Sequence, residues 1–196
     1  MRETPFDETL FLDTDTYINS DLTGLFQLLN SYDLGIAHDP SYNTHLLSSV
    51  PESFPEYNTG VLLYDNNSEV DELMKAWNDY YDQMDDEHNS KDQPAFRRAL
   101  YHSEVDYITL TREWNCFYNF PGYIAEPPKI LHGRIPSPKR AARIHNDSGI
   151  YRRTWFRLQS MQSKTYFPGY LKMVLTSIEE NGIRETYHKI KSSVLD

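Results

Sequence analysis

Two aspartates, Asp13 and Asp15, stand one residue apart directly after the apolar run Thr9–Leu12. Alternate residues of an extended strand project from the same face, so both carboxylates can reach one ligand where the strand ends. Like charges held this close repel each other and usually require a cation or strong donors between them. Carboxylate oxygens suit Mg²⁺ or Mn²⁺, which commonly bridge to phosphate. The pair therefore predicts a metal site that handles a phosphorylated substrate, although a solvated loop whose carboxylates cap the following turn is the simpler alternative.

A second polar segment, Asn58–Thr59–Gly60, stands at the start of an apolar run that predicts a strand over Gly60–Tyr64. The amide of Asn58 can both donate hydrogen bonds to sugar hydroxyls and accept them. Gly60, which has no side chain, allows the backbone to approach a ligand closely. An ordinary turn entering a strand would have the same composition, so this segment gains weight only beside the aspartates.

A third segment, Asp92-Gln93-Pro94, opens a helix predicted for Asp92–Tyr101. The free N–H groups and the dipole at a helix N-terminus favour an anion or a polar ligand. An acid at the N-terminus with proline in the first turn is also common in helices that bind nothing.

His132 follows the short apolar run Ile130–Leu131. An imidazole could complete a carboxylate-plus-imidazole site suited to Mn²⁺. The neighbouring cations Arg134, Lys139 and Arg140 could hold phosphate oxygens. A lone histidine more often has a structural role, and that alternative stays open.

Hydrophobic periodicity predicts the strands and helices that must position these residues. Further predicted strands cover Leu34–Ala37 and Tyr107–Leu110. One helical stripe joins Leu22, Leu25, Phe26 and Leu29, capped by Ser20 or Asn19; a second runs over Val70–Tyr81 behind a capping box at Ser68–Asp71. The proline-rich segment Gly122–Ser148 is predicted to be loop with short strands. The order of elements predicts an α/β fold, most simply one sheet flanked by helices.

Two regions are expected along the chain. Residues 1–148 form the domain that carries the polar segments, and residues 149–196 form a helical extension packed on it. The extension is predicted from a stripe over Leu171–Ile178 and a second over Ile183–Ile190.

Composition limits the class of protein. The chain has 196 residues, 39% of them apolar and 24% charged, enough for one domain with a real core. It contains no run of about 18 apolar residues, so no transmembrane helix is expected. The N-terminus lacks a signal-peptide core, and the single cysteine, Cys116, favours a reducing compartment. A cytoplasmic location is therefore expected.

The charge of the chain is divided unevenly. Residues 1–128 carry a formal charge of −18 and residues 129–196 carry +8, which gives −10 in total. The acidic part argues against nucleic-acid binding, which needs a basic face. The basic C-terminal part could contact an anionic membrane or a phosphate-rich partner, or simply neutralise the acidic part across a surface. Peripheral membrane contact and oligomer formation both remain possible.

Taken in order, the polar segments resemble the GT-A nucleotide-sugar glycosyltransferases. The likeness is greatest to family 8, which contains glycogenin and bacterial galactosyltransferases. The matching segments are Phe6–Tyr17, Tyr57–Leu62, Asp92-Gln93, Trp114-Asn115 and Ile130–Gly133. The resemblance implies a GT-A-like α/β fold and transfer of a sugar, of the hexosyl type, from a nucleotide-diphospho-sugar such as a UDP-sugar. The acceptor, which could be a saccharide, a protein or a lipid, is not specified.

The resemblance also implies roles for individual residues. Asp15 would ligate Mn²⁺ (or Mg²⁺), Asp13 would contact the ribose, the metal or both, and His132 would be the third protein ligand. Asn58 and Gly60 would contact the donor, while Asp92 and Gln93 would face the reacting centre. Family 8 enzymes retain anomeric configuration, which makes Asp92 or Gln93 a stabiliser; in an inverting enzyme Asp92 would be the base.

Two departures from the family pattern affect these expectations. Gly133 is followed by Arg134-Ile135-Pro136 rather than by a Lys-Pro-Trp segment, so Arg134 or Lys139 would replace the phosphate-binding lysine. The aspartate pair lies about a hundred residues earlier than in such domains. The expectation is an N-terminally shortened, partial domain.

Three alternatives compete with a glycosyltransferase. Haloacid-dehalogenase phosphatases also place this aspartate pattern after a strand, but they require Thr or Val where the sequence has Tyr17. Some polymerases carry Asp-Thr-Asp at a two-metal site, but the chain lacks their other elements. The third alternative is an inactive relative that binds a sugar or a nucleotide, or a fragment that needs its missing half.

Overall fold

The computed structural model describes residues 4–40, 49–84, 91–120, 122–147 and 154–155, with Ile178, Gly182 and Ile183. The α/β prediction is confirmed. In chain order the elements are β1 (Glu8–Leu12), β2 (Thr16–Ile18), α1 (Thr23–Phe26), the 3-10 helix η1 (Gln27–Asn30), β3 (Leu34–His38), β4 (Tyr57–Asp65), α2 (Ser68–Asp82), α3 (Gln93–Tyr101), β5 (Tyr107–Leu110), β6 (Cys116–Phe117), β7 (Gly122–Tyr123), β8 (Ile130–His132), α4 (Pro138–Asp147) and β9 (Thr154–Trp155). Over these described ranges no helix is long and apolar enough to cross a bilayer.

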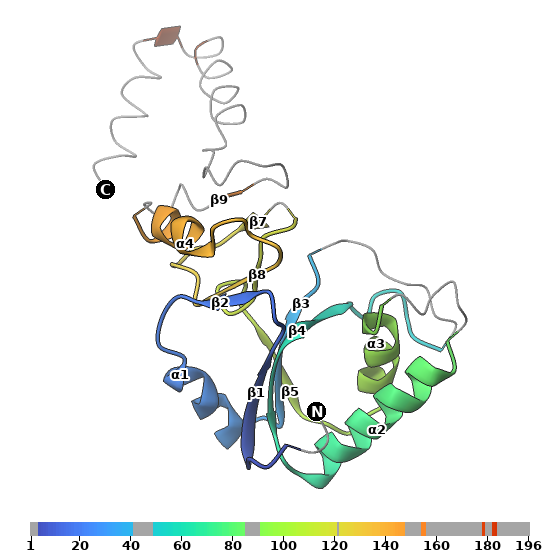
Figure 1. Ribbon diagram of the computed structural model, residues 1–196. Helices are drawn as coiled ribbons and strands as arrows, with labels where there is room; N and C mark the ends of the chain where they lie inside the picture. Colours follow the sequence, from blue (N-terminus) through green and yellow to red (C-terminus); the bar gives the residue numbers. More distant parts are fainter. Residues whose placement is uncertain are drawn as a thin grey trace.

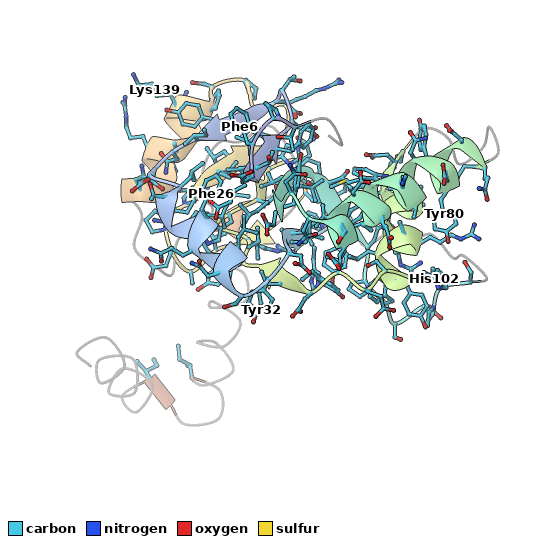
Figure 2. The ribbon with its side chains drawn as sticks, turned by 90° about the horizontal axis from the view of Figure 1, so that it is seen from below. Phe6, Phe26, Tyr32, Tyr80, His102 and Lys139 are labelled. Atoms are coloured by element: carbon cyan, nitrogen blue, oxygen red, sulfur yellow. The ribbon has the colours of Figure 1, made fainter. Side chains whose placement is uncertain are left out.

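The main sheet has four strands in the order β1-β4-β3-β5. Strand β4 pairs antiparallel with both β1 and β3, and β5 pairs parallel with β3. Helices α2 and α3 cover one face of this mixed sheet, and α1 with η1 covers the other (Figure 1). Figure 2 shows the same division, with Phe26 on the α1 side and Tyr80 and His102 on the side of α2 and α3.

This topology brings distant segments to one edge of the main sheet. Strands β1, β3 and β5 all run opposite to β4, so their C-terminal ends meet at the edge where β4 begins. Asp13 follows β1, Asp39 follows β3, and Asn58 to Gly60 lie in the first half of β4. Residues of three separate segments, two of which were predicted to belong to the site, are therefore neighbours before any side-chain contact is considered.

The core of the main sheet follows from the alternation of side chains along β4. Leu62 and Tyr64 pack in the cluster that includes α2 and α3, whereas Leu63 packs with Leu25 on the opposite face. Because both faces are covered, every residue of β4 except Asp65 is buried. The sequence of this strand is correspondingly a nearly continuous apolar run from Gly60 to Tyr64.

The structure has a second sheet, whereas the sequence analysis expected a single sheet. It has the order β2-β8-β6 and packs, with α4, around Cys116, Ile124, Leu131, Ala141 and Ala142. These elements lie together at one end of the main sheet (Figure 1). A separate two-stranded sheet pairs β7 with β9.

Helix α4 lies inside the segment predicted to be loop with short strands, so that part of the prediction was wrong. The prolines of this segment argued against a helix. Pro138, however, is the first residue of α4, where proline costs no hydrogen bond. Ala141, Ala142 and His145 are buried along its length, whereas Arg143 between them is exposed.

Two helix starts also differ from the prediction. The Leu22–Leu29 stripe forms only the short α1 and η1, and its N-cap is Leu22, which makes no side-chain cap hydrogen bond; Oδ1 of the preceding Asp21 accepts from the N–H and the hydroxyl of Thr23. Helix α2 is capped by Asn67, whose Oδ1 accepts from Val70 N–H at 2.9 Å, rather than by Ser68. Asp21 and Asn67, which accept hydrogen bonds at these two starts, have short polar side chains of a kind that several neighbouring positions could have supplied equally well.

Two further expectations are revised or left untested. Strand β1, expected to be buried, is an edge strand with half-buried side chains over Thr9–Leu12. The helical extension over residues 149–196 lies outside the described residues, apart from β9 and three isolated helical positions.

Candidate metal centre

Main-chain hydrogen bonds fix the turn that carries the two aspartates. Asp13 N–H donates to the Gly60 carbonyl at 2.9 Å, which extends the pairing of β1 with β4 by one residue. The N–H and hydroxyl of Thr16 donate to the Asp13 carbonyl at 3.2 and 2.8 Å. The turn is therefore closed by a backbone carbonyl and not by a carboxylate, which leaves the side chains of Asp13 and Asp15 available to a ligand.

The second sheet brings His132 to the same place. Thr16 in β2 pairs with His132 in β8, and Gly133 N–H donates to the Asp15 carbonyl at 3.0 Å. As a result, His132 Nε2 lies 3.5 Å from Asp13 Oδ2 and 3.4 Å from Asp15 Oδ1. One ligand atom from each of the three residues lies within 4.8 Å of the other two. The structure thus brings together the three residues that the sequence predicted as metal ligands.

The donor set fits a hard divalent cation. Octahedral coordination with bonds of about 2.1 Å places adjacent ligand atoms roughly 3 Å apart, slightly closer than the distances seen here. Two carboxylates and an imidazole are a mixed oxygen and nitrogen set of the kind that suits Mn²⁺.

Gly60 leaves the space that this arrangement needs. A Cβ on Gly60 would lie 2.2 Å from His132 Cε1 and 2.6 Å from Asp13 Oδ2. Any side chain at this position would therefore displace the imidazole or the carboxylate. The groups that lie against the Gly60 backbone are the side chains of His132 and Asp13, whereas the predicted approach of this backbone to a ligand stays a prediction.

Burial and charge act in opposite directions on His132. Burial lowers the pKa of its imidazole, while the carboxylates of Asp15 and Asp13 raise it in part. The aspartates themselves are much more exposed, with 38% of the Asp15 side chain and 48% of the Asp13 side chain accessible. The arrangement therefore favours a neutral imidazole beside two solvated carboxylates.

Asp92 lies beside this cluster at the start of α3. Its carbonyl accepts from Trp77 Nε1 at 3.1 Å and from Phe96 N–H at 3.0 Å, and its carboxylate contacts the Thr59 hydroxyl at 3.2 Å. Burial raises the pKa of Asp92, the hydrogen bond from Thr59 lowers it, and the nearby charge of Asp13 raises it. Its side chain does not cap α3, so the carboxylate is available to a ligand.

Gln93, the second predicted catalytic residue, is held by a residue that the sequence analysis did not select. Its Nε2 donates to Oδ2 of Asp39, in a short contact. Asp39 N–H in turn donates to the Glu56 carbonyl at 2.9 Å. The available signal was positional, because Asp39 follows a predicted strand just as Asp13 does.

The remaining predicted site residues, Asn58 and Arg134, lie in different environments. Asn58 lies within β4 rather than in a turn before it, and its Oδ1 accepts from Asn115 Nδ2 at 2.8 Å. Asn115, which the sequence analysis named only within a family-like segment, also bonds to His132. Arg134 is exposed, two residues after His132. Lys139 lies on the outer side of α4 (Figure 2).

Two solved structures are similar to the chain at low identity. The glycosyltransferase GlyE of Streptococcus pneumoniae is 22% identical with a TM-score of 0.46, and the match covers 69% of this chain and 35% of GlyE. The galactosyltransferase LgtC, solved with donor and acceptor sugar analogues, is 14% identical with a TM-score of 0.48, and the match covers 68% and 55%. The chain thus spans about a third to a half of these proteins. No curated protein matches it.

A family model described as nucleotide-diphospho-sugar transferase matches residues 8–120. This range runs from β1 to β6 and contains both aspartates, Asn58, Gly60 and the Asp92-Gln93 pair, whereas His132 lies beyond it. The match covers more than half of the chain. The chain belongs to the nucleotide-diphospho-sugar transferase family.

Proposed function

We propose that this protein is a metal-dependent glycosyltransferase that moves a hexosyl group from a UDP-sugar or a related nucleotide sugar to an acceptor hydroxyl. The observation that supports the proposal best is the set of ligand atoms from Asp13, Asp15 and His132, all within 4.8 Å of one another. Two of these residues lie within the range that matches the family of nucleotide-diphospho-sugar transferases.

Asp13, Asp15 and His132 would hold Mn²⁺, or Mg²⁺ in its place. When bound, the cation supplies Lewis-acid stabilisation of the charge on the departing nucleoside diphosphate. The exposed guanidinium of Arg134 is suited to hold a phosphate oxygen beside the same site, because its planar donors match phosphate geometry.

Asp92 and Gln93 would act on the sugar. The raised pKa of Asp92 brings its carboxyl nearer to neutral pH, where a general base is effective. In an inverting reaction Asp92 removes the proton of the acceptor hydroxyl. In a retaining reaction Asp92 and Gln93 stabilise the charge at the anomeric carbon. Asp39 holds the Gln93 amide nitrogen, so the carbonyl oxygen of the same amide would be the atom that acts on the sugar.

A thermal-shift titration with Mn²⁺ and a panel of nucleotide sugars tests the proposal, together with measurement of nucleotide release. A ligand at a hundred times its Kd stabilises the native state by about 2.7 kcal/mol. We expect a shift that requires Mn²⁺ and selects one nucleotide, together with release of that nucleotide when an acceptor is present. Binding without release would indicate a binding-only relative, and no response to any donor would contradict the proposal.

A further inference from the structure

The backbone N–H of Gly60 is a donor of fixed polarity that lies beside the residues proposed to bind the metal. The register between β3 and β4 shifts between Ile36, which faces Leu62, and Ala37, which faces Asn58. Gly60 lies within this irregular stretch, and its N–H donates to Asn58 Oδ1 at 3.3 Å. A backbone N–H can only donate, so the atom of the Asn58 amide that faces it must be the oxygen.

The orientation of the Asn58 amide fixes the orientation of the Asn115 amide. Asn115 lies 2.8 Å from the same Asn58 oxygen and must therefore present its NH₂ group there. Its own oxygen then faces His132 Nδ1, at 2.9 Å. Amide orientations and histidine tautomers are assigned from hydrogen-bond networks, and here one unambiguous donor orients both amides.

The outcome at His132 is a defined tautomer. Because an amide oxygen can only accept, Nδ1 must carry the proton, and the lone pair is left on Nε2. Nε2 is the atom that faces Asp13 and Asp15. The side chains are shielded from solvent, with exposures of 5% for Asn58, 4% for Asn115 and 3% for His132. The Phe117 ring packs against the imidazole at a centroid distance of 4.7 Å.

We propose that Asn115 is a positioning residue that holds His132 as the Nδ1–H tautomer, with its Nε2 lone pair directed at the cation site between Asp13 and Asp15. The inference rests on the proposed metal site and deepens it. Residues that bond to the second nitrogen of a ligand histidine fix its ring and its tautomer, and their loss typically lowers metal affinity about 10- to 100-fold.

Two measurements test the inference. The first is a long-range ¹H–¹⁵N NMR spectrum of the metal-free protein at pH 8, above the ordinary imidazole pKa of about 6.5, which reports which nitrogen of His132 is protonated. The second is the Kd for Mn²⁺ alone, by calorimetry, in wild type, Asn115→Leu and Asn115→Asp. Leucine removes the acceptor. Aspartate keeps an oxygen facing His132 Nδ1 and loses only the NH₂ group that faces Asn58 Oδ1, which still accepts from Gly60 N–H.

We expect the Nδ1–H tautomer in wild type, a Kd raised about 10- to 100-fold in Asn115→Leu, and a Kd within a few-fold of wild type in Asn115→Asp. An Nε2–H tautomer in wild type, or equal affinity in wild type and Asn115→Leu, would overturn the inference while leaving the metal site in place. Absence of Mn²⁺ binding in wild type would overturn the proposed function, and the NMR result on wild type would still decide the tautomer. The wild-type spectrum needs no variant to fold.

Discussion

The main sheet and the second sheet supply one site with groups in contrasting environments. The carboxylates follow an edge strand of the main sheet and keep 38% to 48% of their side chains in contact with solvent. The imidazole comes from the second sheet and is almost fully buried. Burial lowers the pKa of the His132 imidazole and so favours its neutral form, in which one ring nitrogen has a free lone pair. The main sheet therefore supplies groups that solvent and ligands can reach, and the second sheet supplies a shielded one.

The two regions also differ in how they are packed. The cluster between the main sheet and helices α2 and α3 contains large side chains such as Phe96 and Trp77, whose rings meet edge to face at 4.8 Å. Among the residues that the structure describes, the cluster of the second sheet contains five buried residues, two of which are alanines. We infer that the first region supplies most of the stability and the second supplies the orientation of His132.

Removal of a proposed metal-ligand carboxylate should have the largest effect. We expect Asp15→Ala to lower Mn²⁺ affinity by roughly 100-fold or more, since losses of outer partners alone reach about 100-fold. The metal-free melting temperature should change little, because the Asp15 side chain is partly exposed and its main chain carries the turn. Calorimetry with Mn²⁺ measures the first effect and thermal melting the second. Asp79→Ala, an exposed carboxylate on α2, is the matched control and should bind as wild type.

A methyl group added at Gly60, where the two regions meet, should weaken Mn²⁺ binding nearly as much as Asp15→Ala does. Gly60→Ala places a Cβ where His132 and Asp13 now lie, so we expect Mn²⁺ binding to fall below detection. In Gly35→Ala, on the neighbouring strand, the added Cβ would meet Leu110 at 3.2 Å and Leu63 at 3.3 Å. That variant should lose some stability but retain its Kd for Mn²⁺. Equal affinities in the two variants would show that the close approach at Gly60 does not matter.

Truncation of one leucine in each region would test whether the main sheet supplies stability and the second sheet the orientation of His132. Leu62→Ala and Leu131→Ala should each cost about 2–5 kcal/mol of unfolding free energy, because both side chains are fully buried. Only Leu131→Ala, next to His132 in β8, should also weaken Mn²⁺ binding, by a few-fold. Denaturant unfolding and calorimetry on both variants test this. The division of roles fails if Leu62→Ala weakens binding as much as Leu131→Ala does.

Asp92→Asn should have the smallest effect, and it should be favourable for stability. Folding raises the pKa of Asp92, so its ionised form destabilises the native state above that pKa and has no such cost below the unfolded value. Asparagine keeps a partner for Thr59 without the charge. We expect a slightly higher melting temperature at pH 8 and no gain at pH 3, with turnover reduced. A melting temperature lowered at pH 8 would contradict this.

The sequence predicted the part of the site that depends on strand ends. Asp13 and Asp15 follow an apolar run, and Asp92-Gln93 opens a helix, so local pattern was sufficient to select them. Asp39 and Asn115 were not selected, because their importance arises from partners 54 and 57 residues away in the chain. Such pairings depend on the strand order β1-β4-β3-β5, which periodicity does not reveal.

The fold, like the candidate site, was predicted in part. The long helix α2 and strand β4 were expected because their apolar patterns extend over several turns or residues. Helix α4 was missed because its few buried residues are small and prolines surround its start. The N-caps differ from the expected residues, since α1 has Leu22 rather than Ser20 or Asn19 and α2 has Asn67 rather than Ser68. Several short polar side chains precede each helix, and the local pattern does not choose among them.

Cys116 gives the second sheet a chemical reporter of its own. It is the single cysteine of the chain, it is fully buried, and burial raises the pKa of its thiol, so a thiol reagent cannot modify it in the closed structure. Its labelling rate therefore measures how often this region opens. Because it adjoins Asn115 and Phe117, both in contact with the His132 side chain, occupancy of the site should be readable as a slower rate of alkylation.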